Sequence, residues 1–288
     1  MSDQSRNAAS VQRHEHPGGS WELATRAAVP AVRPLIPVYV GYSERTSLPL
    51  RRLEVPHPNV TVIINLGAPL AVHAPAIESR GPTFPSFAAG LFDTVVVTET
   101  ADESSGIELN LTPLGMWQLA GVPMEELRNR VVRLEDLFGG WATCLERQLR
   151  EAPSWDARFD LLDAVLSRRF RSRAGPPNAV TWGWEQVASG AMTVGEIGRT
   201  LQWSRRRLGV AFRTYLGLTP KALQRLVRFD RVVQQVRRPG VARWSVLAHR
   251  CGYADQAHLA REFREYSGLT LTEFRRRFDP DLPGLRED

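Results

Sequence analysis

The feature that most constrains this chain of 288 residues is an internal repeat in its C-terminal part. One copy of the repeat contains the segment that starts at Leu208, and the other contains the segment that starts at Leu259. Residues at matching positions of these two segments are 51 positions apart and are of the same type. The matched pairs are Leu208 and Leu259, Phe212 and Phe263, Arg213 and Arg264, Gly217 and Gly268, Leu218 and Leu269, and Thr219 and Thr270. Two copies are too few for a solenoid, so the repeat predicts one supersecondary unit that is used twice.

Each copy predicts two short helices joined by a tight turn. In the first copy, Thr193 and Glu196 have the spacing of a capping box, and Ser204 precedes the second helix as its N-cap. Asp255 takes the same place in the second copy. In both copies the second helix has one apolar face and one basic face, a combination typical of a helix-turn-helix.

A longer helix is predicted between the two copies. Residues 220–238 begin with Pro220 and keep the apolar periodicity of a helix for about five turns. Such a helix would hold two recognition helices at a fixed separation. We therefore expect them to enter two successive major grooves on one face of duplex DNA, which lie about 34 Å apart.

The net charge of +6 is unevenly distributed along the chain. Residues 1–177 carry a formal charge of −2, and residues 178–288 carry +8. The basic part is expected to meet a polyanion, although charge alone does not distinguish DNA, RNA and a membrane surface. No apolar run is long enough to span a membrane, and two distant cysteines fit a cytoplasmic location.

The first part of the chain is expected to be rich in β-structure. Short runs with β-branched residues recur between Pro, Gly, Asn and Ser, and they favour a small barrel, cupin-like fold or sandwich. These runs are 37–43, 48–55, 59–67, 69–75, 91–100 and 105–113. Helices are expected over 122–131 and between 134 and 171.

These observations predict an α+β chain with several domains. Residues 1–28 are predicted to be a flexible tail, and residues 29–172 a β-rich regulatory, effector or dimerisation domain with trailing helices. A linker rich in Gly and Pro is expected over 173–180. An all-α domain with two helix-turn-helix units is predicted over 181–279.

The sequence of the repeat resembles the AraC/XylS family of bacterial transcription regulators. The string L-A-x-x-C-G-Y-x-D-Q-A-H-L-x-R-x-F-R-x-x-x-G-L-T, from Leu247 to Thr270, resembles the second helix-turn-helix of that family. The segment from Ser204 to Pro220 resembles the first, and the resemblance covers about residues 180–278. A looser resemblance of 121–139 to a bacterial subgroup implies an upstream regulatory domain.

The resemblance implies which side chains contact DNA. The nominated base-reading residues are Arg205, Arg206, Arg207, Val210, Gln256, His258 and Arg261. The nominated phosphate-binding residues are Ser204, Arg213, Arg264, Arg275 and Arg276. Gln suits adenine and Arg suits guanine in the major groove. Two positions depart from the family pattern, because Val210 stands where many relatives have Arg and Leu271 stands where Pro is usual.

No catalytic or metal site is expected from the sequence. His14 and His16 lack a third ligand, His57 and His73 lack the grouping of a metal-binding cupin, and Asp102 to Ser104 predict a polar turn. We therefore expect no cofactor, no metal and no enzymatic activity. The residues that bind an effector stay unknown at this point.

The sequence thus favours a DNA-binding transcription regulator whose N-terminal domain responds to an effector or a partner. The expected partners are double-stranded DNA, a small-molecule effector, a second copy of the chain contacted through the N-terminal domain, and RNA polymerase, but no membrane. Two alternatives stay open: an architectural DNA-binding protein without an effector, and a cupin-like enzyme fused to a DNA-binding module.

Overall fold

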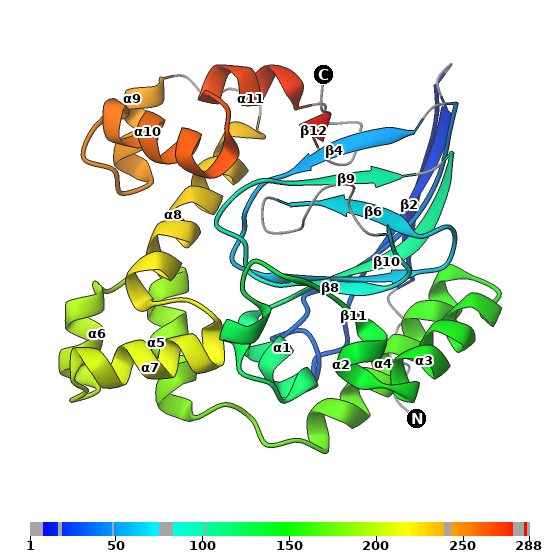
Figure 1. Ribbon diagram of the computed structural model, residues 1–288, viewed down its shortest axis with the longest axis horizontal. Coiled ribbons are helices and arrows are strands. Elements are labelled where there is room, and N and C mark those ends of the chain that lie inside the picture. The colour runs from blue at the N-terminus through cyan, green and yellow to red at the C-terminus, as the bar shows by residue number, and fades with distance from the viewer. Residues whose placement is uncertain are drawn as a thin grey trace.

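The N-terminal part folds into two antiparallel sheets that face each other (Figure 1). The computed structural model describes residues 8–16, 19–47, 49–74, 83–100, 102–238, 243–278 and 285–286. Within these residues, one sheet has seven strands in the order β1-β2-β3-β10-β5-β8-β11, and the other has five in the order β12-β4-β9-β6-β7. The strands alternate buried and exposed residues, which places a core between the sheets.

The strand bounds follow the predicted runs closely in the middle of the domain. The strands are β1 (Ser10–His16), β2 (Gly19–Ala27), β3 (Val38–Thr46), β4 (Leu50–Glu54), β5 (Val60–Asn65), β6 (Leu70–His73), β7 (Thr83–Phe84), β8 (Phe87–Ala89), β9 (Val96–Thr100), β10 (Glu103–Leu111), β11 (Val131–Arg133) and β12 (Leu285–Arg286). The last of these pairs with β4, so the C-terminal end returns to the N-terminal sheet.

The prediction of a flexible tail over 1–28 was wrong for the residues that the structure describes. Strands β1 and β2 pair with each other, and β2 also pairs with β3. The reason is visible in β2, where alternate residues point to opposite faces and Ala24 and Arg26 are buried. Residues 1–7 of the predicted tail lie outside the described residues.

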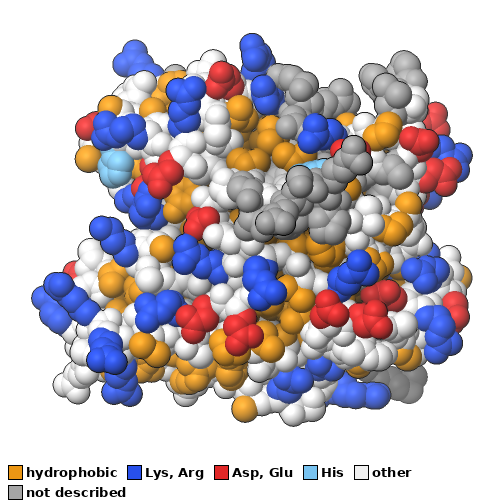
Figure 2. Space-filling view, viewed as in Figure 1, with side chains coloured by type: hydrophobic (Ala, Val, Ile, Leu, Met, Phe, Trp, Pro, Cys, Tyr) orange, Lys and Arg blue, Asp and Glu red, His pale blue; other side chains and the backbone are white. Residues whose placement is uncertain are grey.

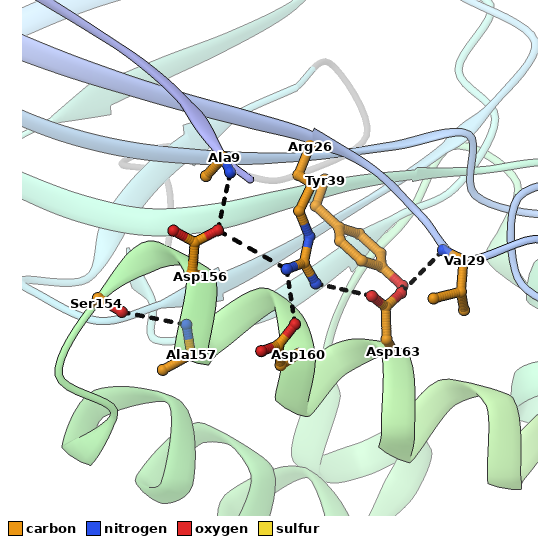
Figure 3. A network of polar contacts seen from close by, with 9 residues as sticks. All are labelled: Ala9, Arg26, Val29, Tyr39, Ser154, Asp156, Ala157, Asp160 and Asp163. Atoms are coloured by element: carbon orange, nitrogen blue, oxygen red, sulfur yellow. Dashed lines mark hydrogen bonds and ion pairs between the residues drawn. The ribbon is translucent and has the colours of Figure 1, made fainter. Parts of the chain in front are cut away.

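A buried arginine joins this sheet to the helix behind it (Figure 3). The side chain of Arg26, on β2, is only 6% exposed. Its guanidinium donates to Asp160 and Asp163 of helix α4 (Trp155–Arg171), both at 2.7 Å. Asp163 also accepts from the hydroxyl of Tyr39 at 2.8 Å. The charge of Arg26 is thereby balanced and hydrogen-bonded, which a buried guanidinium requires.

The helices follow in two groups (Figure 1). The first group covers the lower side of the sheets and the second forms an arc beside them. The bounds are α1 (Pro113–Ala120), the 3-10 helix η1 (Met124–Leu127), α2 (Leu134–Phe138), α3 (Gly140–Glu151), α4 (Trp155–Arg171), α5 (Asn178–Ser189), α6 (Val194–Thr200), α7 (Arg205–Leu216), α8 (Pro220–Val236), α9 (Trp244–Arg250), α10 (Gln256–Ser267) and α11 (Leu271–Arg277).

The expected helix over 122–131 was wrong beyond Leu127. Only η1 is helical there, and Arg128 is extended, with a φ of −60° and a ψ of 130°. Asn129 has a φ of 53°, a left-handed conformation that ends helical geometry. The chain then pairs with β8 as strand β11, because Val131 and Val132 favour a strand.

The predicted fold class is confirmed: a β-rich N-terminal part is followed by a helical part with two helix-turn-helix units. In Figure 1, α8 runs from the group α5–α7 to the group α9–α11. None of the helices in the described part of the chain has the length and apolar character needed to cross a bilayer.

Candidate nucleic-acid interface

The turns of the two repeat copies have the same backbone geometry. The amide of Trp203 donates to the carbonyl of Gly198 at 2.9 Å, and the amide of Tyr253 donates to that of Ala248 at 2.9 Å. The predicted N-caps are confirmed, because Ser204 and Asp255 each accept from a backbone amide three residues later. The repeat in the sequence is therefore a repeat in structure, with α7 and α10 as the second helix of each unit.

The first turn of α7 presents three arginines to solvent. Arg205, Arg206 and Arg207 are exposed. The guanidinium of Arg207 lies 4.6 Å from the ring centroid of Trp203, so it is held against the preceding turn. Val210 lies one turn further along and is 48% exposed. An exposed Val at this position can contact a thymine methyl group.

The matching face of α10 carries a different set of side chains. Gln256 and Arg261 are exposed. His258 is half-buried, and its ring lies edge-on to that of Tyr253 with centroids 5.2 Å apart. This packing limits the orientations that His258 can take, whereas Gln256 and Arg261 are exposed on the outer face of the helix.

The nominated phosphate-binding residues fall into two groups. Arg264, Arg275 and Arg276 are exposed near the ends of α10 and α11. Ser204 acts as an N-cap, and Arg213 is in contact with the N-terminal part of the chain. Figure 2 shows Lys and Arg side chains along the edge of the molecule formed by α6, α7, α9 and α10. Basic side chains at the outer edge of both units suit a phosphate backbone.

A buried ion pair sets the position of α10 on α8. The carboxylate of Glu262 is 5% exposed and accepts from the guanidinium of Arg225 at 2.8 Å and from that of Arg228 at 2.8 Å. Arg228 also lies 4.4 Å from the ring centroid of Tyr253, in the turn before α10. Both arginines belong to α8, so this cluster of four residues, called here the Glu262 clamp, fixes the second recognition helix to the spacer helix.

The charge state of the clamp follows from its contacts. Burial acts to raise the pKa of Glu262, but hydrogen bonds from Arg228 and Arg225 outweigh it and hold the pKa below its usual range. Burial, and then the neighbouring charge of Glu262, raises the pKa of Tyr253 far above its ordinary value. Glu262 is therefore ionised and Tyr253 neutral at neutral pH, and the ion pair is complete.

Sequence analysis did not single out this clamp. Glu262 lies among the apolar positions of α10, between Leu259 and Phe263, and that placement is the signal of a buried charge. A charged residue on an apolar face requires a partner of opposite charge. The partners are more than thirty residues away in sequence, so only the fold brings them into contact.

The C-terminal end of α7 packs against the N-terminal domain. The rings of Trp117 on α1 and Tyr215 on α7 have centroids 4.8 Å apart. Gly217 ends α7 with a φ of 80°, and a Cβ atom there would lie 3.0 Å from the carbonyl oxygen of Met124. Two features therefore favour glycine at this position: the left-handed backbone and the close approach of η1.

An ion pair lies beside this contact, on the outer face of α7. The Nε atom of Arg213 is 3.7 Å from a carboxylate oxygen of Glu125 on η1. Both side chains are nearly half exposed, so the pair is weak. Arg213 is a nominated phosphate-binding residue, and in this conformation its partner is a protein carboxylate.

A cavity of about 350 Å³ lies between the two sheets. Its walls come from strands of both sheets, and include Ile63, Val72 and Phe87. Arg237, the residue that follows α8, also lines it. The cavity is therefore bounded both by the β-rich domain and by the end of the spacer helix. Within the described residues, no three His, Cys, Asp or Glu side chains are grouped so as to hold a metal ion.

Comparison with known families gives a match to a helix-turn-helix domain over residues 197–277. The resemblance of the repeats to AraC/XylS-family regulators is thereby confirmed for this part of the chain. The matched segment contains both recognition helices, the Glu262 clamp and the whole of α8.

Solved structures with a similar fold are distant in sequence. ToxT from Vibrio cholerae with an unsaturated fatty acid bound is 10% identical, with 96% of this chain and 100% of that chain covered and a TM-score of 0.47. A DNA-binding transcriptional dual regulator from Escherichia coli K-12 is 23% identical over 35% of this chain and 99% of that chain, with a TM-score of 0.28. The AraC-like transcriptional activator CuxR is 16% identical, with 79% of this chain and 86% of that chain covered and a TM-score of 0.31. A search of curated proteins gives no match.

The Glu262 clamp predicts a large effect of one substitution on stability. Glu262→Ala leaves Arg225 and Arg228 without their carboxylate, and we expect it to lower the free energy of unfolding of the helix-turn-helix domain by about 3 kcal/mol. Urea denaturation of the variant measures this change. Glu265→Ala is the matched control on the same helix, because Glu265 is 61% exposed and, among the residues that the structure describes, pairs with Arg225. It should cost less than about 1 kcal/mol, and equal losses in the two variants would contradict the role given to burial.

Proposed function

We propose that this chain is a sequence-specific transcription regulator that binds duplex DNA through both helix-turn-helix units and that its N-terminal domain binds an effector. The observation that carries the proposal is the helix-turn-helix match over two structurally repeated units, each with an exposed second helix. The proposal describes a binding protein of the bacterial cytoplasm rather than an enzyme. RNA polymerase and a second copy of the chain are its further partners.

The exposed side chains support a division of labour at the DNA. Gln256 and Arg261 on α10, together with Arg205, Arg206 and Val210 on α7, are positioned to read bases in the major groove. Arg207 and His258 belong to the same set of nominated residues, but each packs against an aromatic ring of the preceding turn. Arg264, Arg275 and Arg276 are proposed to bind phosphate, which positions the domain without selecting a sequence.

The contacts of the N-terminal domain support a route for regulation. One contact is on α7, through Trp117 and Glu125, and the other is at the end of α8, where Arg237 lines the cavity. An effector that changes the cavity therefore acts at the spacer helix, which carries both recognition helices. Effector binding shifts the population of DNA-binding conformations only if its affinity differs between them.

An architectural DNA-binding protein is the second candidate function. The basic outer edge of the helix-turn-helix domain favours it as well, because phosphate contacts alone support binding without sequence preference. The two functions differ in one measurable respect, since a regulator protects a defined site and an architectural protein covers any sequence. The prediction below separates them.

Arg261→Ala should weaken binding to the cognate site by about 1–3 kcal/mol and affect random DNA less, because the lost contact is to a base. Fluorescence anisotropy measures the affinity for a duplex that carries the cognate site and the affinity for a random duplex of equal length, both at one salt concentration. Arg276→Ala is the matched control, since removing a phosphate contact should weaken binding to both duplexes equally. Equal losses on both duplexes for Arg261→Ala would contradict base reading by this residue.

Glu125→Ala tests the contact between η1 and α7. Removing the carboxylate leaves Arg213 available to phosphate, so DNA affinity of the full chain should rise by about 0.2–1 kcal/mol, the range for an exposed ion pair. Glu126→Ala removes an equal charge from the neighbouring exposed residue and controls for the change in net charge. An increase of the same size in the control would show that the Arg213 pair does not restrain DNA binding.

A further inference from the structure

The cavity between the sheets has an apolar part and a polar part. Leu23, Ile63, Val72, Phe87 and Phe92 line the apolar part. The remaining wall carries ionisable side chains from several elements: Glu44, Arg52, Glu54, His57, Glu108 and Arg237. A cavity of about 350 Å³ with apolar walls and a few polar groups is in the range of sites for small organic molecules.

The charges on this wall are not all paired. Glu44, whose side chain is 6% exposed, accepts from Arg52 at 2.7 Å, so these two side chains neutralise each other. Burial, together with the charge of Arg237, lowers the pKa of His57 to about 4, so His57 is neutral at neutral pH. Burial, and then the charge of Glu54, raises the pKa of Glu108. With one guanidinium, that of Arg237, on this part of the wall, ionisation of both Glu54 and Glu108 leaves one negative charge without a partner, and a cation beside them favours that ionised state.

Each of these two carboxylates accepts a hydrogen bond from a neighbouring side chain. Glu54 accepts from the hydroxyl of Thr98 at 3.2 Å, and Glu108 accepts from the side-chain amide of Asn110 at 2.6 Å, in both cases through Oε1. The two side chains come from opposite sheets, on β4 and β10, and repel each other across the cavity. A donor placed between them would satisfy both and remove the repulsion.

Unsatisfied buried groups at the same cavity give a second, independent indication of a ligand. Glu44 Oε2 is buried and has no hydrogen-bond partner among the described residues. Arg237 Nε is also buried and has no acceptor among the residues that the structure describes. Its guanidinium lies 5.4 Å from the ring centroid of Phe278, and the charges of Glu54, Asp230 and Glu108 act on it. Buried polar atoms without partners are rare in folded proteins, so each of these two atoms calls for a bound water, ion or ligand.

We propose that this cavity binds a small organic amine, with the ammonium group between Glu54 and Glu108 and the apolar part against Ile63, Val72 and Phe87. One positive charge on the ligand balances the negative charge that an ionised Glu108 adds beside Glu54, and the apolar wall matches an aromatic or aliphatic body. A carboxylate ligand fits less well, because it would meet two carboxylates and only one unpaired guanidinium. This inference rests on the proposed role of the cavity as the effector site.

The test compares three probes of similar size that differ in charge. Phenethylamine is a cation at neutral pH, phenethyl alcohol is neutral and hydrocinnamate is an anion. Isothermal titration calorimetry with the full chain, without DNA, should show one site at which phenethylamine binds at least about tenfold more tightly than the other two probes. Because DNA is absent, a failure here overturns the amine site alone, and the DNA titration of Arg261→Ala still tests the proposed function.

Three variants and one control locate the charge. Glu54→Gln and Glu108→Gln should each weaken phenethylamine binding by about tenfold or more and leave phenethyl alcohol unaffected. Glu99→Gln is the matched control, because Glu99 lies on strand β9 outside the cavity lining and pairs with Arg51. Arg237→Gln should strengthen phenethylamine binding, since it removes a competing positive charge.

Three results would overturn the proposal. The first is tighter binding of hydrocinnamate that is lost in Arg237→Gln, which would assign an anion site to Arg237. The second is equal affinity for all three probes, which would make the polar wall irrelevant to recognition. The third is no saturable binding of any probe by the wild-type chain.

Discussion

The buried ion pair of Glu262 with Arg225 and Arg228 is the interaction on which the DNA-binding geometry depends. It joins α10 to α8 at a point where both helices also share an aromatic core, with the rings of Phe229 and Phe263 5.3 Å apart. A carboxylate that has lost its hydration is satisfied only when the two guanidinium groups are in place, so the pair tolerates few alternative packings. The separation of the two recognition helices is set by this contact together with the 17 residues of α8.

The N-terminal domain touches this rigid unit near both ends. The aromatic contact of Trp117 with Tyr215 and the close approach of Met124 to Gly217 hold the end of α7. At the other end of α8, Arg237 lines the cavity between the sheets, and strand β12 returns the chain to β4. Under the proposed function, the cavity that would hold a ligand and the outer edge that would contact DNA belong to elements joined by one helix. That arrangement allows binding at one site to change affinity at the other, provided that each of the two ligands binds two conformations of the chain with different affinity.

Much of the helix-turn-helix domain was predictable because its signals are local. The capping box of Thr193 and Glu196 and the N-caps Ser204 and Asp255 are determined by residues three positions apart, and all are present. The Glu262 clamp and the cavity were not predicted, because they depend on residues that are distant in sequence. The sequence predicts a flexible tail where strand β2 lies, because the N-terminal residues have no apolar core. The structure shows Arg26 of this strand buried, because its guanidinium forms ion pairs with Asp160 and Asp163 of α4.

We propose that α7 and α10 act as a rigid pair that reads two successive major grooves. The most direct measurement is the affinity of the full chain for duplexes in which the two contacted segments, mapped by footprinting, are separated by inserted base pairs. An insertion of about five base pairs turns one segment to the opposite face of the helix. Because α8 and the Glu262 clamp do not let the recognition helices rotate apart, we predict that affinity falls to the level of random DNA. Affinity equal to that of the parental duplex would contradict the account.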